Sequence, residues 1–463
     1  KQKTAYEITY GDWSSDMCSS DLARAREATD KLRLSGSGNA YLQNLRGMIF
    51  LALHQPAEAI PAWRRALREP VRWLVGLVSC SLAAWVGLLP LMALYFNVFT
   101  PVSIVANIIV IPLVGIIIPI GMCSAAVPPL AATLNNANYF LLQAMIHVIN
   151  WLSHLPAAHW AVRTPPVALT ATYYVILLAV ILRGWKLRWL GLPVAVFVAG
   201  LAWPEKAVEL TVLDLRDGVA VFVNAPGEHD DWLIDGGSSW SGERVVVPYL
   251  RAQGVDRLAA VVVTRGDKAH AAGLTAVTKA LPVRQAIHTG AGSRSPFFWQ
   301  WLETSRRQGL SIVTLRAGDE RKAGPVRICA LHPPVGLVSD RSDDNSLVLL
   351  VQFGPTRVLL TSDIGASVEK QLGAIPAQVL IKGRHSDEDS GTDVLLDGVR
   401  PEVVIQAVGT RPSDRYLQPD MRERLRARGV RFYRTDEVGA VTVRLTESGY
   451  TIRACVGDAG PAR

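Results

Sequence analysis

"VVVTRGDKAHAAGL", residues 261–274, is a β-branched run joined to a polar loop. Three valines and a threonine are typical of a buried strand. Arg265, Asp267 and His270 follow the run, and the small residues after them can open a helix. The stretch therefore predicts a strand, a loop and a helix, with the polar side chains held at the end of the strand.

Other polar side chains in the same half also follow apolar runs. Asp235 follows "WLI", Asp363 ends "VLLTSD", and His385 comes shortly after "VLIKG". Further strands are expected in "VELTVLDL", "VAVFVNAP", "SLVLLVQF" and "PEVVIQA". Helices are expected at residues 243–253, 271–280, 297–308, 366–373 and 418–428. Strands in two groups with helices outside them predict a layered α/β sandwich that gathers loop residues at one edge.

No acidic residue occurs between Glu69 and Glu205. A carboxylate in hydrocarbon costs roughly 2.5–3.5 kcal/mol on insertion scales, so such a tract indicates a membrane domain. The tract contains five apolar stretches, the last of them short for the ~20 residues of a span. They cover residues 71–96, 101–127, 134–155, 168–184 and 189–203. We expect a transmembrane domain at residues 71–203, with a broken or re-entrant helix at Pro112 and Pro119, and a separate domain at 204–463.

Basic residues predict the orientation of these spans, because cytoplasmic loops collect Lys and Arg. The two basic clusters are Arg64, Arg65, Arg68 and Arg72 before the first stretch, and Arg183, Lys186 and Arg188 before the fifth. If the first cluster lies in the cytoplasm, four crossings of the membrane bring the second cluster back to the cytoplasmic side. A fifth crossing then places residues 204–463 outside the cytoplasm, which is the orientation we expect; without that crossing the domain stays inside.

Residues 1–70 differ in character from the rest. "DWSSDMCSSDL", residues 12–22, has no hydrophobic periodicity and resembles a translated sequencing adapter, so residues 1–22 are expected to be a non-native scar. Residues 23–70 contain apolar residues at helical spacing, interrupted by a Gln-Pro turn, and resemble one tetratricopeptide helix pair. A single repeat cannot bury its apolar face, so no function is assigned to this segment.

Several blocks of residues 71–455 occur in the order and spacing of a known family. The blocks are "LPLMALYFNVFTPVSIVANIIVIPLVG", "LIDGG", "VVPYLRAQGVDRL", "ALHPP", "DDNSLVLLVQFGPTRVLLTSD" and "YRTDEVGAV". They resemble the ComEC family of competence membrane proteins. The resemblance implies an α-helical transmembrane bundle followed by a four-layer (αββα) metallo-β-lactamase-like sandwich. Proteins of this family carry single-stranded DNA across the inner membrane, and their metal domain is thought to degrade the other strand.

The metal motifs of the family are altered in this chain. The pattern T-H-x-D-x-D-H is "TRGDKAH" at residues 264–270, and G-H-H-G-S is "GRHSD" at residues 383–387. The remaining candidate metal ligands are Asp267, His270, Asp363 and His385, and Asp267 and Asp363 are also the candidate catalytic residues. These are too few for two ions at the ~3.5–4 Å spacing of two-metal hydrolases. We expect no cofactor, or at most one divalent ion, zinc or manganese.

Arg265 and Arg384 stand where the family has histidines. A guanidinium stays protonated in proteins and cannot ligate a metal. Two interpretations remain open. The arginines form ion pairs with the carboxylates left behind, or they contact DNA phosphates, which arginine matches bidentately. Under both interpretations the hydrolase domain is expected to be catalytically degenerate, a pseudo-enzyme.

Three functions are consistent with these observations. The main hypothesis is a multi-pass inner-membrane component of DNA uptake, which translocates single-stranded DNA in natural competence and carries an inactive metallo-hydrolase domain. The alternatives are an active membrane-tethered nuclease or phosphodiesterase, and a non-catalytic binding module. The resemblance implies single-stranded DNA, membrane lipid, a cytoplasmic ATP-driven motor and DNA receptor proteins as partners.

Overall fold

The computed structural model describes most of the chain after residue 55. The described ranges are 56–156, 158–184, 191–201, 207–227, 230–291, 293–336, 341–383, 390–409 and 419–456, with Glu27, Trp189 and Ser339 as single positions. For residues 56–70, 419 and 420 the description covers the backbone alone. The expected scar at 1–22 and most of the expected helix pair at 23–70 lie outside these ranges. The chain divides into two compact units, residues 1–89 with 100–159, and residues 90–99 with 160–463.

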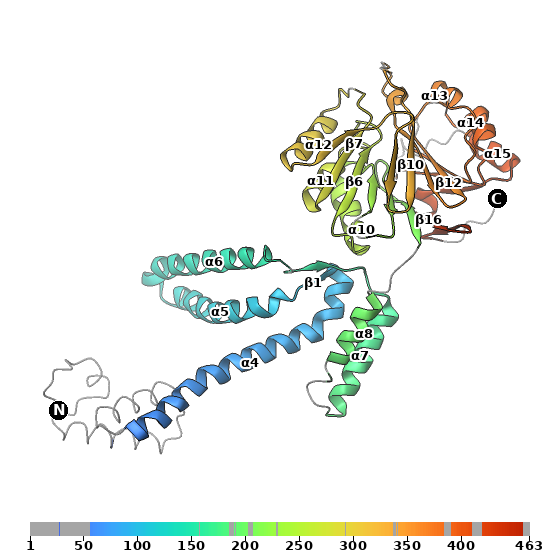
Figure 1. The fold of residues 1–463 in the computed structure, drawn as a ribbon. Coiled ribbons are helices and arrows are strands. Elements are labelled where there is room, and N and C mark those ends of the chain that lie inside the picture. Colours follow the sequence, from blue (N-terminus) through green and yellow to red (C-terminus); the bar gives the residue numbers. More distant parts are fainter. Residues whose placement is uncertain are drawn as a thin grey trace. The chain divides into compact units, whose positions relative to one another are not determined.

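The first unit is helical. It contains most of α4 (Pro56–Phe96), then α5 (Val102–Ala126) and α6 (Ala131–Ser153), which lie side by side (Figure 1). A short 3-10 turn, η1 (Pro128–Leu130), joins α5 to α6. The interruption expected in the second apolar stretch is wrong, because α5 continues through Pro112 and Pro119 as one helix.

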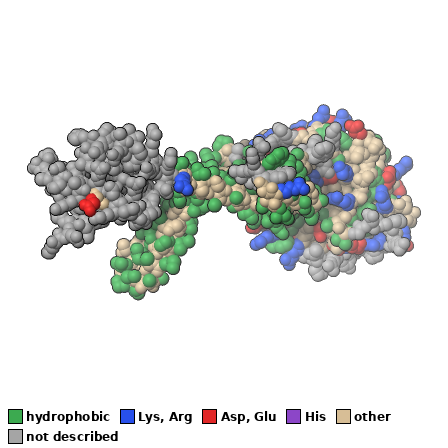
Figure 2. Space-filling model, turned by 90° about the horizontal axis from the view of Figure 1, so that it is seen from below, with side chains coloured by type: hydrophobic (Ala, Val, Ile, Leu, Met, Phe, Trp, Pro, Cys, Tyr) green, Lys and Arg blue, Asp and Glu red, His purple; other side chains and the backbone are tan. Residues whose placement is uncertain are grey.

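All five apolar stretches form helices, the last two being α7 (Val167–Leu182) and α8 (Gly191–Leu201). Among the described residues, Val71–Phe96 and Val102–Ala126 are long and apolar enough to cross a membrane, with mean hydropathies of 2.0 and 2.6. On the face seen in Figure 2, hydrophobic side chains cover the described helical part almost without acidic residues, whereas basic and acidic side chains mix on the C-terminal domain. The helices thus bear the composition of a lipid-facing surface.

The second unit contains two large mixed sheets. Strands β1 (Val98–Phe99) and β2 (Trp160–Ala161) form a separate antiparallel pair in the same unit. The eight-stranded sheet has the order β17-β16-β3-β4-β5-β6-β7-β8, and the seven-stranded sheet has the order β15-β14-β13-β12-β11-β10-β9. The strands of the first sheet are β3 (Val208–Val212), β4 (Val221–Asn224), β5 (Trp232–Ile234), β6 (Leu258–Val263), β7 (Val283–His288), β8 (Ser311–Thr314), β16 (Val441–Thr446) and β17 (Gly449–Ala454). Those of the second are β9 (Glu320–Ala323), β10 (Val326–His332), β11 (Val348–Phe353), β12 (Thr356–Ser362), β13 (Val379–Lys382), β14 (Val403–Gln406) and β15 (Arg431–Arg434).

Helices cover the outer face of each sheet (Figure 1). The first sheet carries α9 (Ser239–Ser241), the π-helical turn η3 (Gly242–Val246), α10 (Val247–Ala252), α11 (Leu274–Ala280) and α12 (Pro296–Arg307). The second carries α13 (Ala366–Gln371), α14 (Asp393–Val399) and α15 (Pro419–Ala427), and α16 (Thr435–Val438) follows β15. Of these, α14 is a helix that the sequence pattern did not predict.

Side chains that alternate between the two faces of each strand form three hydrophobic layers. In β6, Ala260 and Val262 belong to the core between the two sheets, whereas Val261 and Val263 pack toward the helices. Successive strand side chains point to opposite faces, so a strand covered on both sides is apolar throughout. A third cluster packs α13–α15 against the second sheet. The layers therefore confirm the predicted four-layer αββα sandwich for the described residues between 207 and 456.

Parallel strands determine where loop residues gather. Strands β5, β6, β7 and β8 run parallel in the first sheet, and β12, β13 and β14 run parallel in the second. The carboxyl ends of neighbouring parallel strands meet at one edge of a sheet, which is where binding sites form in α/β folds. The loops after β5, β6 and β12 supply the candidate site.

Candidate functional site

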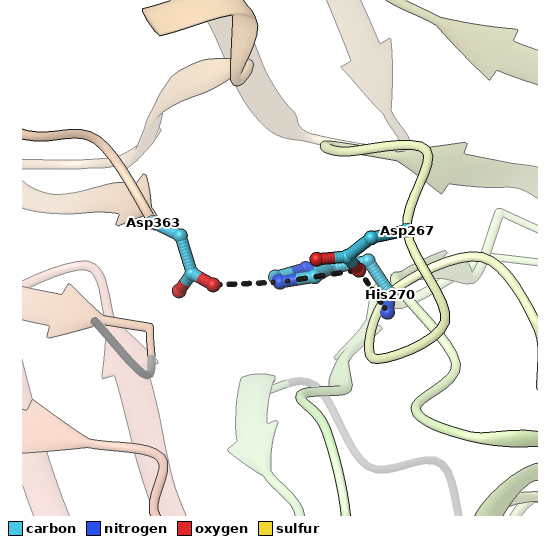
Figure 3. Close-up of side chains that lie close together, drawn as sticks. All are labelled: Asp267, His270 and Asp363. Atoms are coloured by element: carbon cyan, nitrogen blue, oxygen red, sulfur yellow. Dashed lines mark hydrogen bonds and ion pairs between the residues drawn. The ribbon is translucent and has the colours of Figure 1, made fainter. Parts of the chain in front are cut away.

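The centre of the site is the imidazole of His270, which is fully buried in the loop that follows β6. Its Nδ1 lies 2.9 Å from Oδ2 of Asp235, and its Nε2 lies 3.0 Å from Oδ2 of Asp363. Figure 3 shows Asp363 pointing at the ring from the end of β12, while Asp267 and His270 come from the loop after β6. Loop side chains from both sheets are therefore in contact at this histidine.

Asp235 fixes the start of the loop. It has a positive φ of 58°, which places its carboxylate beside Thr264 at the end of the neighbouring strand. The backbone N–H of Thr264 donates to Oδ1 of Asp235 at 2.8 Å, and the Thr264 hydroxyl donates to Oδ2 at 2.5 Å. The hydroxyl of Ser362, in the other sheet, lies 2.7 Å from that of Thr264. These buried hydrogen bonds hold the acceptor of His270 in a single position.

Arg265 joins three carboxylates around the same point. Its Nη2 lies 2.8 Å from Asp343, its Nε lies 3.1 Å from Asp267, and its Nη1 lies 3.4 Å from Asp363. Asp343 precedes β11 and Asp363 follows β12, so the guanidinium reaches from the first sheet to two loops of the second. The arginine is thus arranged as an ion-pair partner of the residual acidic residues.

The carboxylates around His270 decide its charge. Burial by itself lowers the pKa of the imidazole, but the nearby carboxylates of Asp235, Asp363 and Asp267 outweigh it and raise that pKa well above its ordinary value. An opposite charge within ~4–6 Å favours the charged form of a group. These carboxylates therefore favour the imidazolium form of the ring, in which both ring nitrogens donate hydrogen bonds.

Three residues could hold a metal ion. Ligand atoms of Asp267, His270 and Asp363 lie within 4.8 Å of one another. Three protein ligands plus water are the usual set of a catalytic zinc site, and the contact of Asp235 with Nδ1 is the kind that orients a ligating histidine. The donors therefore fit one divalent ion. Such an ion must displace the proton from Nε2 and the guanidinium of Arg265 from Asp267 and Asp363.

The described residues contain no second group of three such donors. Arg384 and His385, which sequence analysis also named, lie outside the described residues. Asp343 is a functional candidate that sequence analysis missed. The sequence signal that could have indicated it is the pair of adjacent acidic residues in "DDNS", directly before a buried strand.

A buried ion pair lies in the second sheet, at the end of the neighbouring strand β13. Nζ of Lys382 lies 3.5 Å from Oε1 of Glu369, and both side chains are almost completely buried. Glu369 also accepts from the backbone N–H groups of Gly391 and Thr392, at 2.6 and 2.8 Å. Burial raises the pKa of Glu369, but Lys382 and these N–H groups outweigh it, and the pKa is lowered overall. The pair ties α13 to the end of β13 and to the start of α14.

Comparison with known proteins matches this chain to competence proteins. Residues 47–187 match the family model described as "Competence protein". The chain is 28% identical over 384 residues to the competence protein ComA of Neisseria gonorrhoeae, covering 79% of this chain and 51% of that protein. It is 24% identical over 405 residues to the ComE operon protein 3 of Bacillus subtilis, covering 80% and 51%. The chain thus spans about half the length of the curated relatives it matches.

Solved structures give more distant matches. The metallo-β-lactamase fold protein YhfI from Bacillus subtilis is 12% identical with a TM-score of 0.34, over 54% of this chain and 99% of that one. Zn²⁺-bound PqqB from Methylobacterium extorquens is 12% identical with a TM-score of 0.32, over 49% and 97%. The layers and strand order described above define the fold.

Proposed function

Because the chain belongs to the ComEC family of competence proteins, we propose that it is an inner-membrane component of DNA uptake, through which single-stranded DNA passes during natural competence. The observation that carries the proposal is the similarity to competence proteins over about four fifths of the chain. The apolar helices and the acid-free tract between Glu69 and Glu205 support a membrane location.

We extend the proposal to topology. The five helices at the apolar stretches cross the membrane, and residues 204–463 lie outside the cytoplasm. The basic clusters before the first and fifth stretches support this orientation, because both then face the cytoplasm. A cytoplasmic ATP-driven motor and a DNA receptor protein complete the uptake path.

For the sandwich domain we propose a degenerate hydrolase site. A divalent ion at Asp267, His270 and Asp363 would activate a water for attack on a phosphodiester. In this chain Arg265 instead pairs with Asp267, Asp343 and Asp363, and the carboxylates around His270 raise its pKa, which favours a proton on the nitrogen that a metal would take. Arg265 and His270 thus take the place that the metal ions of an active hydrolase would have.

Metal analysis tests the degenerate site. The full chain is purified in detergent with zinc and manganese present, its metal content is measured, and its nuclease activity is assayed with each ion. We expect much less than one ion per chain and no cleavage above that of an Asp363→Ala variant. Stoichiometric metal, together with cleavage that Asp363→Ala abolishes, would establish the second candidate function, a membrane-tethered nuclease or phosphodiesterase. The three clustered donors are the observation that favours this second function.

A transformation assay tests the uptake role separately. Deletion of the gene in its host should abolish the uptake of labelled DNA, and the intact gene should restore it. A gene carrying Asp363→Ala should restore uptake equally well, because transport in this proposal needs no cleavage by the sandwich domain. Undiminished uptake in the deletion strain would show that the chain is a binding module without a transport role.

A further inference from the structure

The C-terminal half contains four tryptophans, in two different environments. Trp232 and Trp301 are buried in the hydrophobic clusters, as expected for such large side chains. Trp240 and Trp299 are 49% and 50% exposed. Tryptophan is highly buried on average in folded proteins and is enriched at interfaces, so these two half-exposed indoles leave apolar surface available for a contact.

The sheet topology places both exposed tryptophans at the edge where the candidate site lies. Trp240 belongs to α9, which begins four residues after Asp235 at the end of β5. Trp299 lies in the first turn of α12, which follows the end of β7. Because β6 lies between β5 and β7 and all three strands are parallel, the loop of His270 leaves the sheet between the two tryptophans.

The segments that lead to Trp240 and to Trp299 both lie against the loop at residues 264–273. On one side, Val219 donates to the carbonyl of Ala269 at 3.1 Å, and Gly236 donates to that of His270 at 2.9 Å. On the other side, a Cβ at Gly266 would collide with Ser293, whose carbonyl accepts from the indole N–H of Trp299 at 2.8 Å. The two indoles are therefore held on opposite sides of one loop.

Basic side chains accompany the tryptophans along this edge. The guanidinium of Arg216 lies 5.6 Å from the ring centre of Trp240, and Lys268 and Arg294 are exposed on the loops after β6 and β7. Arg316, which is partly exposed, follows the end of β8.

We infer that the carboxyl edge of β5–β8 is a binding surface for single-stranded nucleic acid, in which Trp240 and Trp299 stack on bases and Arg216, Lys268, Arg294 and Arg316 contact phosphates. Aromatic platforms interleaved with cations are the general means of binding single strands without sequence preference, because every base has a π-face. The inference rests on the proposed function and adds to it the residues that hold the strand. The ligand passes over the site without being cleaved there.

Binding of a fluorescent oligothymidylate of about 15 nucleotides to the full chain in lipid nanodiscs tests the inference. Fluorescence anisotropy is measured for the parent and for Trp240→Leu and Trp299→Leu, which keep apolar bulk but lose the π-face. Trp240→Phe and Trp299→Phe restore the π-face. Val394→Ala is the matched control, since Val394 is 51% exposed on α14 of the other sheet. An abasic oligonucleotide of equal length separates stacking from charge.

We expect each leucine variant to bind the oligothymidylate about 10-fold more weakly, within the range for stacking of one base. The phenylalanine variants and Val394→Ala should bind like the parent, and the abasic oligonucleotide should not distinguish the variants. Arg294→Gln should lower the dependence of affinity on salt, whereas Arg327→Gln, on β10 of the other sheet, should leave it unchanged.

Equal binding by the leucine variants and the parent would overturn the inference and leave the proposed function intact, since uptake is measured separately in cells. An equal loss of affinity for the abasic oligonucleotide would also overturn it, because the tryptophans would then act without stacking. A parent chain that binds no oligonucleotide would contradict both the inference and the proposed role in DNA transfer.

Discussion

Nε2 of His270 lies 3.0 Å from Oδ2 of Asp363, although the two residues belong to different sheets of the sandwich. Asp235 holds the opposite ring nitrogen at 2.9 Å. The ring thus lies between two buried carboxylates that favour its charged form, and its contacts belong both to the candidate site and to the packing of the two halves.

We expect His270→Ala to destabilise the sandwich. Removal of one partner from a buried ion pair leaves the other charge uncompensated and costs about 3–5 kcal/mol. Hydrogen exchange at the backbone amides of β6 and β12 measures the local free energy of opening. His288→Ala is the control, because the histidine at the end of β7 is partly buried but contacts Phe298 instead of a carboxylate. Exchange rates that stay unchanged in His270→Ala would show that the contacts of the ring with Asp235 and Asp363 do not stabilise the sandwich.

We expect Arg265→His to raise the affinity of the site for zinc by about 10-fold or more, the scale on which changes beside metal ligands act. The substitution removes a cation that contacts three carboxylates and adds a fourth donor beside Asp267, His270 and Asp363. Competition with a chromophoric chelator measures the affinity. Arg284→His, at an exposed position of β7, controls for the added histidine. An equal affinity in the parent chain and in Arg265→His would mean that the arginine does not compete with metal.

We expect Glu369→Gln to destabilise the protein at neutral pH, by about 3–5 kcal/mol, because Lys382 would remain buried without its partner. The lowered pKa of Glu369 sets the pH dependence. The stabilisation is complete above the ordinary glutamate pKa of about 4.3 and is lost as the pH falls through the lower pKa of the folded state. The difference in thermal midpoint between parent and variant should therefore shrink on acidification below that ordinary value.

Glu320→Gln provides the control for that titration, since Glu320 is 42% exposed in its ion pair with Arg327. Exposed pairs contribute little to stability, so its thermal midpoint should follow that of the parent at every pH. A Glu369→Gln difference that is independent of pH would contradict the ion pair.

We expect Gly218→Ala to displace the loop of His270. Gly218 has a φ of 95°, and a Cβ there would collide with the carbonyl oxygen of Ala269. An alanine forced into positive φ costs more than about 1 kcal/mol, and the collision adds to this cost. Gly309→Ala is the matched control, because Gly309 has a φ of 71° and open space around it. Denaturation midpoints should fall further for Gly218→Ala; equal losses would mean that the backbone angle alone matters.

The strand and loop at residues 261–270 follow directly from the local pattern of the sequence. The helix after them starts at Leu274 and not at residue 271, because the loop backbone is engaged elsewhere. The carbonyl of His270 accepts from Gly236, and Gly273 donates to the carbonyl of Gly237. These bonds join residues distant in sequence, and periodicity carries no information about them.

The meeting of Asp267, His270 and Asp363 could be predicted, because each follows a strand and the family motifs align them. The contact of Arg265 with Asp343 could not, since it depends on which loops of the two sheets face each other. The short helix α14 was missed although Thr392 caps it by accepting from Leu395, because its seven residues are too few for a helical period to stand out. The continuity of α5 through two prolines likewise cannot be inferred from composition.

Arg265 and His270 come from one sheet, and Asp343 and Asp363 come from the other. Ion pairs between them link the two halves of the sandwich. In domains whose closure depends on a metal, folding waits for the metal supply. With the degenerate site proposed above, we expect maturation of this domain to be independent of how much zinc or manganese its surroundings contain, and a chelator that strips ions from other proteins to leave it folded.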